Sequence, residues 1–173
     1  MRVTLTSLIF LILICCKREV KTNSDFELID LSIFTGWRDF YCLKVTNDGK
    51  TYAYNNRYRK GETYYTMTLD KIELDSISKL IKSILNSSID TLYENSCVDC
   101  GCFNLIIKTK DQKFKSFVYG INTDNKDVDC MNHLVYFLFQ IAHKYRDTID
   151  SAFVFESKTK HFYPPPPPPP ISD

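Results

Sequence analysis

The spacing of hydrophobic and polar residues divides the middle of the chain into short strands and two helices. In most segments hydrophobic residues alternate with polar ones, and Gly, Asn or Asp residues lie between the segments, which is typical of strands that bury one face. The predicted strands span residues 26–34, 39–47, 50–58, 62–69, 102–109, 113–119 and 151–157. Asn47-Asp48-Gly49 predicts a hairpin, because these residues adopt a positive φ at low cost.

Two other segments repeat their hydrophobic residues every three or four positions, as amphipathic helices do. They run from Ile72 to Leu85 and from Val128 to Tyr145, and Asp70 and Asp75 are the candidate N-caps of the first. The resulting order, ββββ-α-ββ-α-β, predicts an α+β fold: an antiparallel sheet of six or seven strands with both helices packed on one face. Because no alternating βαβ pattern occurs, no topological switch point for a nucleotide is expected.

The length of 173 residues corresponds to one domain with flanking segments. We expect a single α+β domain at 26–157, preceded by a polar tether at 16–25. A tail at 158–173 contains all seven prolines of the chain, in one run at 164–170. Such a run is disordered or forms a polyproline II rod, and it acts either as an inert tail or as a docking peptide for an aromatic groove.

The first residues have the order of an export signal. Arg2 is followed by an apolar run from Leu8 to Ile14, and charge returns at Lys17. Secretory signals have this charged start, short apolar stretch and small-residue cleavage site. A spanning helix needs about 20 apolar residues, more than this segment contains. Residues 1–15 are therefore interpreted as a signal peptide.

Leu13-Ile14-Cys15-Cys16 resembles the lipobox of bacterial lipoproteins, with Cys15 where Gly, Ala or Ser is usual. The resemblance implies that Cys16 becomes the lipidated first residue of the mature protein. Several acyl chains on one residue would anchor it firmly, on the periplasmic or cell-surface side of a bacterial membrane. The whole layout resembles small envelope lipoproteins of Gram-negative bacteria, a likeness that implies no known activity.

The export signal changes the interpretation of CVDCGC at residues 97–102. A zinc site would combine two of these cysteines with Cys130 and His133. A thioredoxin-like site is disfavoured, because Asp99 would raise a neighbouring thiol pKa and a strand follows the motif instead of a helix.

Exported proteins meet oxidising conditions, in which thiols pair. We therefore expect disulfides among four cysteines, in one of three connectivities, with Cys42 left over. The four are Cys97, Cys100, Cys102 and Cys130.

Tyrosines and arginines gather on the presumed hairpin around residues 52–65. Exposed aromatic and Arg side chains are typical of recognition surfaces, although cross-strand tyrosine packing explains the same residues. The candidate recognition patch comprises Tyr52, Tyr54, Arg57, Tyr58 and Arg59.

Charge and motifs exclude several classes of function. The chain has 22 basic and 21 acidic residues, and without Arg2 the two counts are equal. This balance disfavours nucleic-acid binding. No nucleotide-binding loop, nucleophile elbow or zinc-protease motif occurs, so no catalytic residue, cofactor or metal is assigned.

The leading hypothesis is a membrane-tethered, non-catalytic binding or interaction protein of the cell envelope. Its partners would be the membrane, through the N-terminal lipid, and an unidentified envelope protein or glycan. Two alternatives stay open: an envelope hydrolase with dispersed active-site residues, and an immunity lipoprotein that neutralises a toxin.

Overall fold

The computed structural model describes residues 25–158, except 36–38, 58–60, 95–100, 121–125, 145–146 and 150. Within these residues the chain folds as predicted into an α+β domain, with an eight-stranded sheet and two helices. The proposed signal peptide, the lipidation site and the proline run lie outside the described residues.

The sheet is antiparallel except at one edge, and its strand order is β5-β7-β6-β1-β2-β3-β4-β8. The strands are β1 (Leu28–Phe34), β2 (Asp39–Thr46), β3 (Lys50–Arg57), β4 (Gly61–Thr68), β5 (Leu92–Glu94), β6 (Cys102–Lys108), β7 (Lys113–Tyr119) and β8 (Asp147–Ile149). The predicted turn between β2 and β3 is confirmed: Gly49 has φ of 84°, and its N–H donates to the Thr46 carbonyl at 2.9 Å. This backbone conformation favours glycine.

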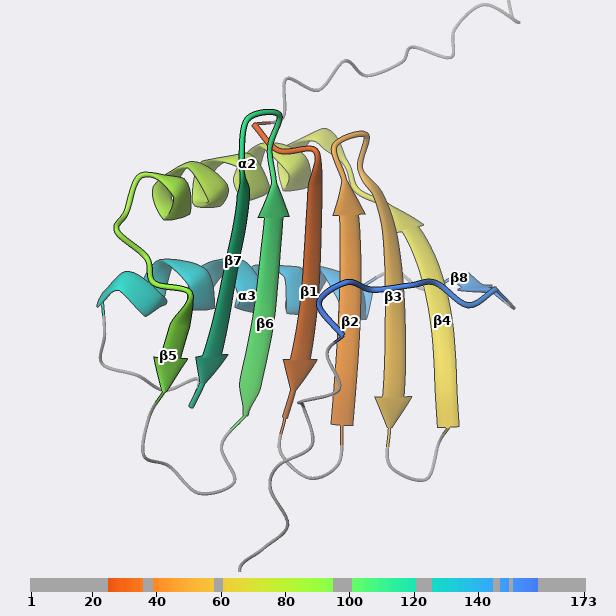
Figure 1. The fold of residues 1–173 in the computed structure, drawn as a ribbon. Coiled ribbons are helices and arrows are strands. Elements are labelled where there is room, and N and C mark those ends of the chain that lie inside the picture. The colour runs from red at the N-terminus through yellow and green to blue at the C-terminus, as the bar shows by residue number, and fades with distance from the viewer. Residues whose placement is uncertain are drawn as a thin grey trace, which may run out of the picture.

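The helices α2 (Lys71–Leu85) and α3 (Lys126–Lys144) both cover the same face of the sheet, behind it in Figure 1. Asp70 is the N-cap of α2, as predicted. Its carboxylate accepts from the Glu73 N–H at 2.8 Å, while Glu73 accepts from the Asp70 N–H at 3.0 Å. Among the described residues, neither helix is long and apolar enough to cross a membrane.

The main hydrophobic core lies between the two helices and the sheet. Alternate residues of each strand point into it, as their period of two requires. Its fully buried members include Ile29, Leu31, Val45, Leu105 and Ile107 from the sheet, Ile77, Ile81 and Ile84 from α2, and Met131, Leu134 and Leu138 from α3. Ile72 begins the hydrophobic repeat predicted for the first helix, but it does not join the core. It is 77% exposed and, with Phe137 and Ile141, lines an open groove between the helices.

Two details of the predicted strand order are wrong. The short strand β5 falls in a segment predicted to be a loop, and it pairs in parallel with β7. The last strand is β8, paired with β4, whereas residues 151–157 form no strand. We call residues 151–158 the C-terminal strap, because they cross β4, β3 and β2 and reach β1 on the face without helices (Figure 1).

Candidate functional site

We call the sheet face opposite α2 and α3 the helix-free face. It carries a group of buried polar side chains. The register places Asp30 and Ser32 of β1 on this face, next to Asn104 of β6 and Cys42 of β2. All four are buried, although each belongs to the sheet face that neither α2 nor α3 covers. The C-terminal strap lies against them.

Direct hydrogen bonds join this polar group to the strap. Asp30 accepts from the Glu156 N–H at 2.7 Å and from the Ser157 hydroxyl at 2.5 Å. The Asn104 amide donates to the Ser157 carbonyl at 2.8 Å, and the Lys44 ammonium donates to the Val154 carbonyl. Three of these contacts are to the main chain of the strap, whose residues 156 and 157 lie in a turn that the Lys158 N–H closes on the Phe155 carbonyl at 3.3 Å.

One strap residue and three residues under it form a chain of hydrogen bonds with a fixed direction. Because Ser157 donates its proton to Asp30, the Ser32 hydroxyl, 2.6 Å away, donates to Ser157. The Cys42 thiol, 3.2 Å from Ser32, then donates to Ser32. Burial raises the pKa of Cys42 to about 12, so the sulfur remains a thiol at neutral pH. A buried protonated thiol is a poor nucleophile. The chain of hydrogen bonds therefore holds the strap in place.

Aromatic side chains form the floor for the first half of the strap. The Phe153 ring lies 4.5 Å from the Tyr52 ring and 6.3 Å from the Tyr64 ring, measured between centroids. Phe155 is buried against Cys42 and Tyr54. These residues form a second, smaller core, separate from the one under the helices.

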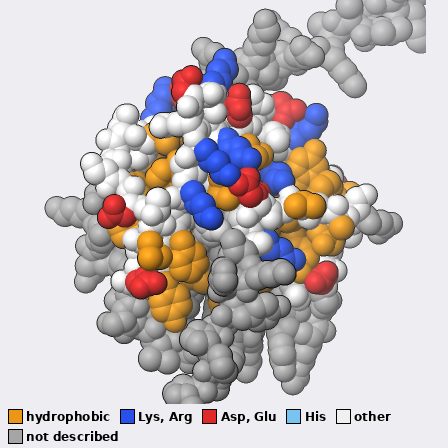
Figure 2. Space-filling view, in the orientation of Figure 1, with side chains coloured by type: hydrophobic (Ala, Val, Ile, Leu, Met, Phe, Trp, Pro, Cys, Tyr) orange, Lys and Arg blue, Asp and Glu red, His pale blue; other side chains and the backbone are white. Residues whose placement is uncertain are grey.

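Lysine side chains gather around the second half of the strap, at the middle of the face in Figure 2, with hydrophobic side chains on either side. Lys108 and Lys113 both bind the Glu156 carboxylate, with 2.7 Å from Lys108 Nζ to the carboxylate. Hydrogen bonds from these two lysines lower the pKa of Glu156 from 4.5 to about 2. The ion pairs therefore support strap docking above about pH 4.5 and are lost as the pH falls towards 2. Glu156 is exposed, so their contribution is small.

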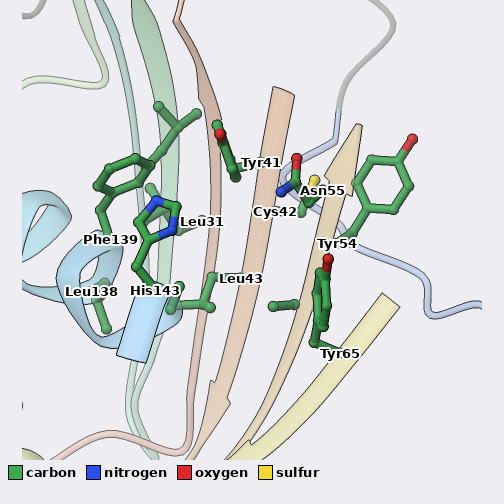
Figure 3. Close-up of a pocket in the computed structure, with 13 residues that line it drawn as sticks. Leu31, Tyr41, Cys42, Leu43, Tyr54, Asn55, Tyr65, Leu138, Phe139 and His143 are labelled. Atoms are coloured by element: carbon green, nitrogen blue, oxygen red, sulfur yellow. The ribbon is translucent and has the colours of Figure 1, made fainter. Parts of the chain in front are cut away.

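A small cavity lies on the other side of the sheet, between β1–β4 and the end of α3 (Figure 3). Its volume is about 30 Å³, and its lining includes Tyr41, Tyr65, Phe139 and His143. Asn55 also lines it, is only 6% exposed, and its Oδ1 has no hydrogen-bond partner among the described residues. The volume suits an ordered water that donates to Asn55, whereas organic ligands occupy cavities of about 300 Å³ or more.

The candidate recognition patch is only partly placed by the structure. Tyr52 and Tyr54 lie together on the helix-free face and contact the strap. Tyr54 is buried, and its hydroxyl donates to Glu62 at 2.8 Å, so it is part of the floor instead of an exposed contact. Arg57 ends β3, and Tyr58 and Arg59 lie outside the described residues.

The predicted disulfides are not settled by the described residues. Cys42, Cys102 and Cys130 are free thiols, whereas Cys97 and Cys100 lie outside the described part of the chain. Cys102 is buried at the start of β6, where burial raises its pKa to about 12. Cys130 lies on α3, 3.5 Å from the Ser83 hydroxyl of α2. No group of three or more metal-ligating side chains occurs within the described ranges.

Sequence reasoning missed Asp30, Ser32 and Asn104 as site residues. All three occupy the polar positions of alternating strands, and such positions normally face water. The signal that distinguishes them is weak: Asp, Ser, Asn and Cys side chains lie at neighbouring positions of β1, β6 and β2, with lysines nearer the ends of β6 and β7. Only the contacts of the strap reveal their role.

No protein-family model matches this chain, and no curated protein sequence is significantly similar to it.

Proposed function

We propose that this chain is an exported, lipid-anchored binding protein of a bacterial cell envelope, and that the helix-free face of its sheet is the binding surface. Residues 1–15 would be removed on export, and Cys16 would carry the lipid. The tether at 16–25 would then hold the domain close to the membrane, where it captures a protein or glycan of the envelope.

The observation that carries the proposal is the composition of the helix-free face. Lysines of β2, β6 and β7 surround a buried polar centre, and aromatic rings lie beside it. Lysine and aromatic side chains together provide charge steering and apolar contact area, which binding surfaces combine. Its polar centre also forms hydrogen bonds with the main chain of the strap, which supports main-chain contacts as part of the proposed binding.

The binding surface can be tested by affinity capture of the lipidated protein from its own envelope after mild cross-linking. Lys113→Glu combined with Lys115→Glu reverses two charges on the helix-free face, and recovery of partners should fall on the order of tenfold. The matched control is Lys71→Glu with Lys79→Glu, which reverses two exposed charges on α2. Equal recovery with both double variants would show that binding occurs elsewhere.

Changing Cys16 to Ala should remove the protein from the membrane fraction. The acylated residue is then missing, and no other part of the proposed anchor has the several chains that stable attachment needs. Fractionation followed by immunoblotting measures the change, and Cys15→Ala serves as the control because it places a usual small residue before the lipidated position. Membrane attachment that survives Cys16→Ala would contradict the lipoprotein assignment.

A further inference from the structure

We propose that the helix-free face is a peptide-binding groove for segments with the order aromatic, any residue, aromatic, acidic, serine, which turn at the last two of these residues, and that the C-terminal strap is its resting occupant. This inference rests on the proposed function, because it names the ligand class of the same surface. The strap supplies the pattern itself, as Phe153-Val154-Phe155-Glu156-Ser157.

The groove binds main-chain atoms at three strap residues, Val154, Glu156 and Ser157. Asp30 accepts the Glu156 N–H, Asn104 donates to the Ser157 carbonyl, and Lys44 donates to the Val154 carbonyl. The three groove side chains come from β1, β6 and β2, so the rigid sheet fixes their spacing. Main-chain contacts of this kind are available to any peptide that adopts the backbone of the strap, including its turn at residues 156 and 157, and they provide affinity without sequence preference.

The preference for particular side chains comes from four positions of the strap. Phe153 lies on Tyr52 and Tyr64, and Phe155 is buried against Tyr54 and Cys42. Two further positions are polar: the Ser157 hydroxyl reaches Asp30, and the Glu156 carboxylate lies between Lys108 and Lys113.

The second position of the pattern, occupied by Val154, carries no preference. The Val154 side chain is 84% exposed, and only its carbonyl is bound. The groove therefore accepts any residue between the two aromatic ones.

The strap can leave without breaking the rest of the fold. Residues 151–158 form no part of the sheet ladder, whose last paired residue is Ile149, opposite Tyr64. Phe155 belongs to the small core on the helix-free face and makes no part of the main core under the helices. A competing peptide has to displace a segment tethered in place, whose effective concentration is on the order of millimolar. A partner that is itself held at the membrane would reach the high local concentration that displacement of the strap requires.

The test uses the full chain and a labelled peptide with the sequence SAFVFESK, identical to residues 151–158. Phe155→Ala weakens the strap of the protein but changes no groove residue. Fluorescence anisotropy should show weak binding to the unchanged protein and at least about tenfold tighter binding to the variant, because the tethered competitor is weakened. The control peptide, with both phenylalanines replaced by alanine, should bind neither protein.

Alkylation of Cys42, followed by mass spectrometry, gives a second measurement on the same samples. Cys42 lies under Phe155, so Phe155→Ala should accelerate its alkylation, and saturating peptide should slow it again. A variant that keeps its native circular dichroism yet binds no peptide at millimolar concentration would overturn the proposal.

If Phe155→Ala does not fold, hydrogen exchange of the unchanged protein decides instead. The Glu156 amide should exchange much faster than the amides of β1, which shows that the strap opens by itself. Exchange of Glu156 only through global unfolding would overturn the proposal.

Peptide binding that fails while lysine-dependent capture persists refutes the peptide assignment alone. Capture that is insensitive to the lysines while the peptide binds refutes the proposed envelope-partner function alone.

Discussion

Replacing Asp30 with Ala should release the C-terminal strap while the main core stays folded. The substitution removes the acceptor for the Glu156 N–H and the Ser157 hydroxyl, and hydrogen bonds to a charged group contribute about 1.5–3 kcal/mol each. Lys44, whose Nζ lies 3.8 Å from the Asp30 carboxylate, loses its ion-pair partner as well. Because the strap is outside the sheet ladder, the loss should appear as local opening.

The alkylation rate of Cys42 measures this opening. We expect it to rise at least about a hundredfold in Asp30→Ala, since each 1.4 kcal/mol corresponds to a factor of ten. Cys102 is the internal control, because it is equally buried but lies at the start of β6. Asp111→Ala, in the exposed turn after β6, controls for loss of a carboxylate. An unchanged Cys42 rate would contradict the role of Asp30, and simultaneous exposure of Cys42 and Cys102 would indicate global unfolding.

Replacing Phe103 with Ala should destabilise the whole domain instead of opening the strap locally. Phe103 is fully buried in the main core, on the face of β6 that the helices cover. Truncation of a buried Phe to Ala costs about 3–5 kcal/mol, because apolar contacts are lost and a cavity remains. Since domains have a total stability of only about 5–15 kcal/mol, the variant should be close to unfolding.

Urea denaturation gives the free energy of unfolding for this comparison. Tyr136→Ala, at a 66% exposed position of α3, is the matched aromatic control and should change stability by less than about 0.5 kcal/mol. In Phe103→Ala, Cys42 and Cys102 should become reactive at the same urea concentration. A Phe103→Ala variant with normal stability would show that the packing of β6 against the helices is not as described.

Features set by neighbouring residues could be predicted from the sequence. The turn at Gly49 and the N-cap of α2 at Asp70 each depend on contacts within four residues. The structure has the turn where it was expected and the N-cap at one of the two candidate positions. The strand and helix periods depend on residue order alone, so the α+β fold followed from them. Short local signals of this kind are sufficient when they agree with the core that they help to form.

Features set by distant residues could not be predicted. β5 is held by the Asp90 carbonyl, which accepts from Ser116, and by the Thr91 carbonyl, which accepts from the Phe117 N–H. Nothing in the three residues of β5 themselves indicates a strand. In the strap, Phe153, Phe155 and Ser157 have the period of a strand, but their partners on β1 and β3 make them cross the sheet instead.

Asp30 shows the same limit for the candidate site. Its position between Ile29 and Leu31 predicts an outward-facing side chain, and it does lie on the polar face of β1. It is buried only because a segment more than a hundred residues later covers it. The polar centre of the site can therefore be identified from the structure but not from the local sequence.

The two outer strands of the sheet, β5 and β8, are short, and this affects how copies of the protein associate at high concentration. Within the described residues, β5 pairs with Phe117–Tyr119 of β7 and β8 with Tyr64–Thr66 of β4, so both margins of this part of the sheet are stepped. A second molecule can add a continuous ladder only along a straight, full-length margin, and short outer strands are a common protection against such growth. Copies at high concentration would thus stay separate and resist fibril formation.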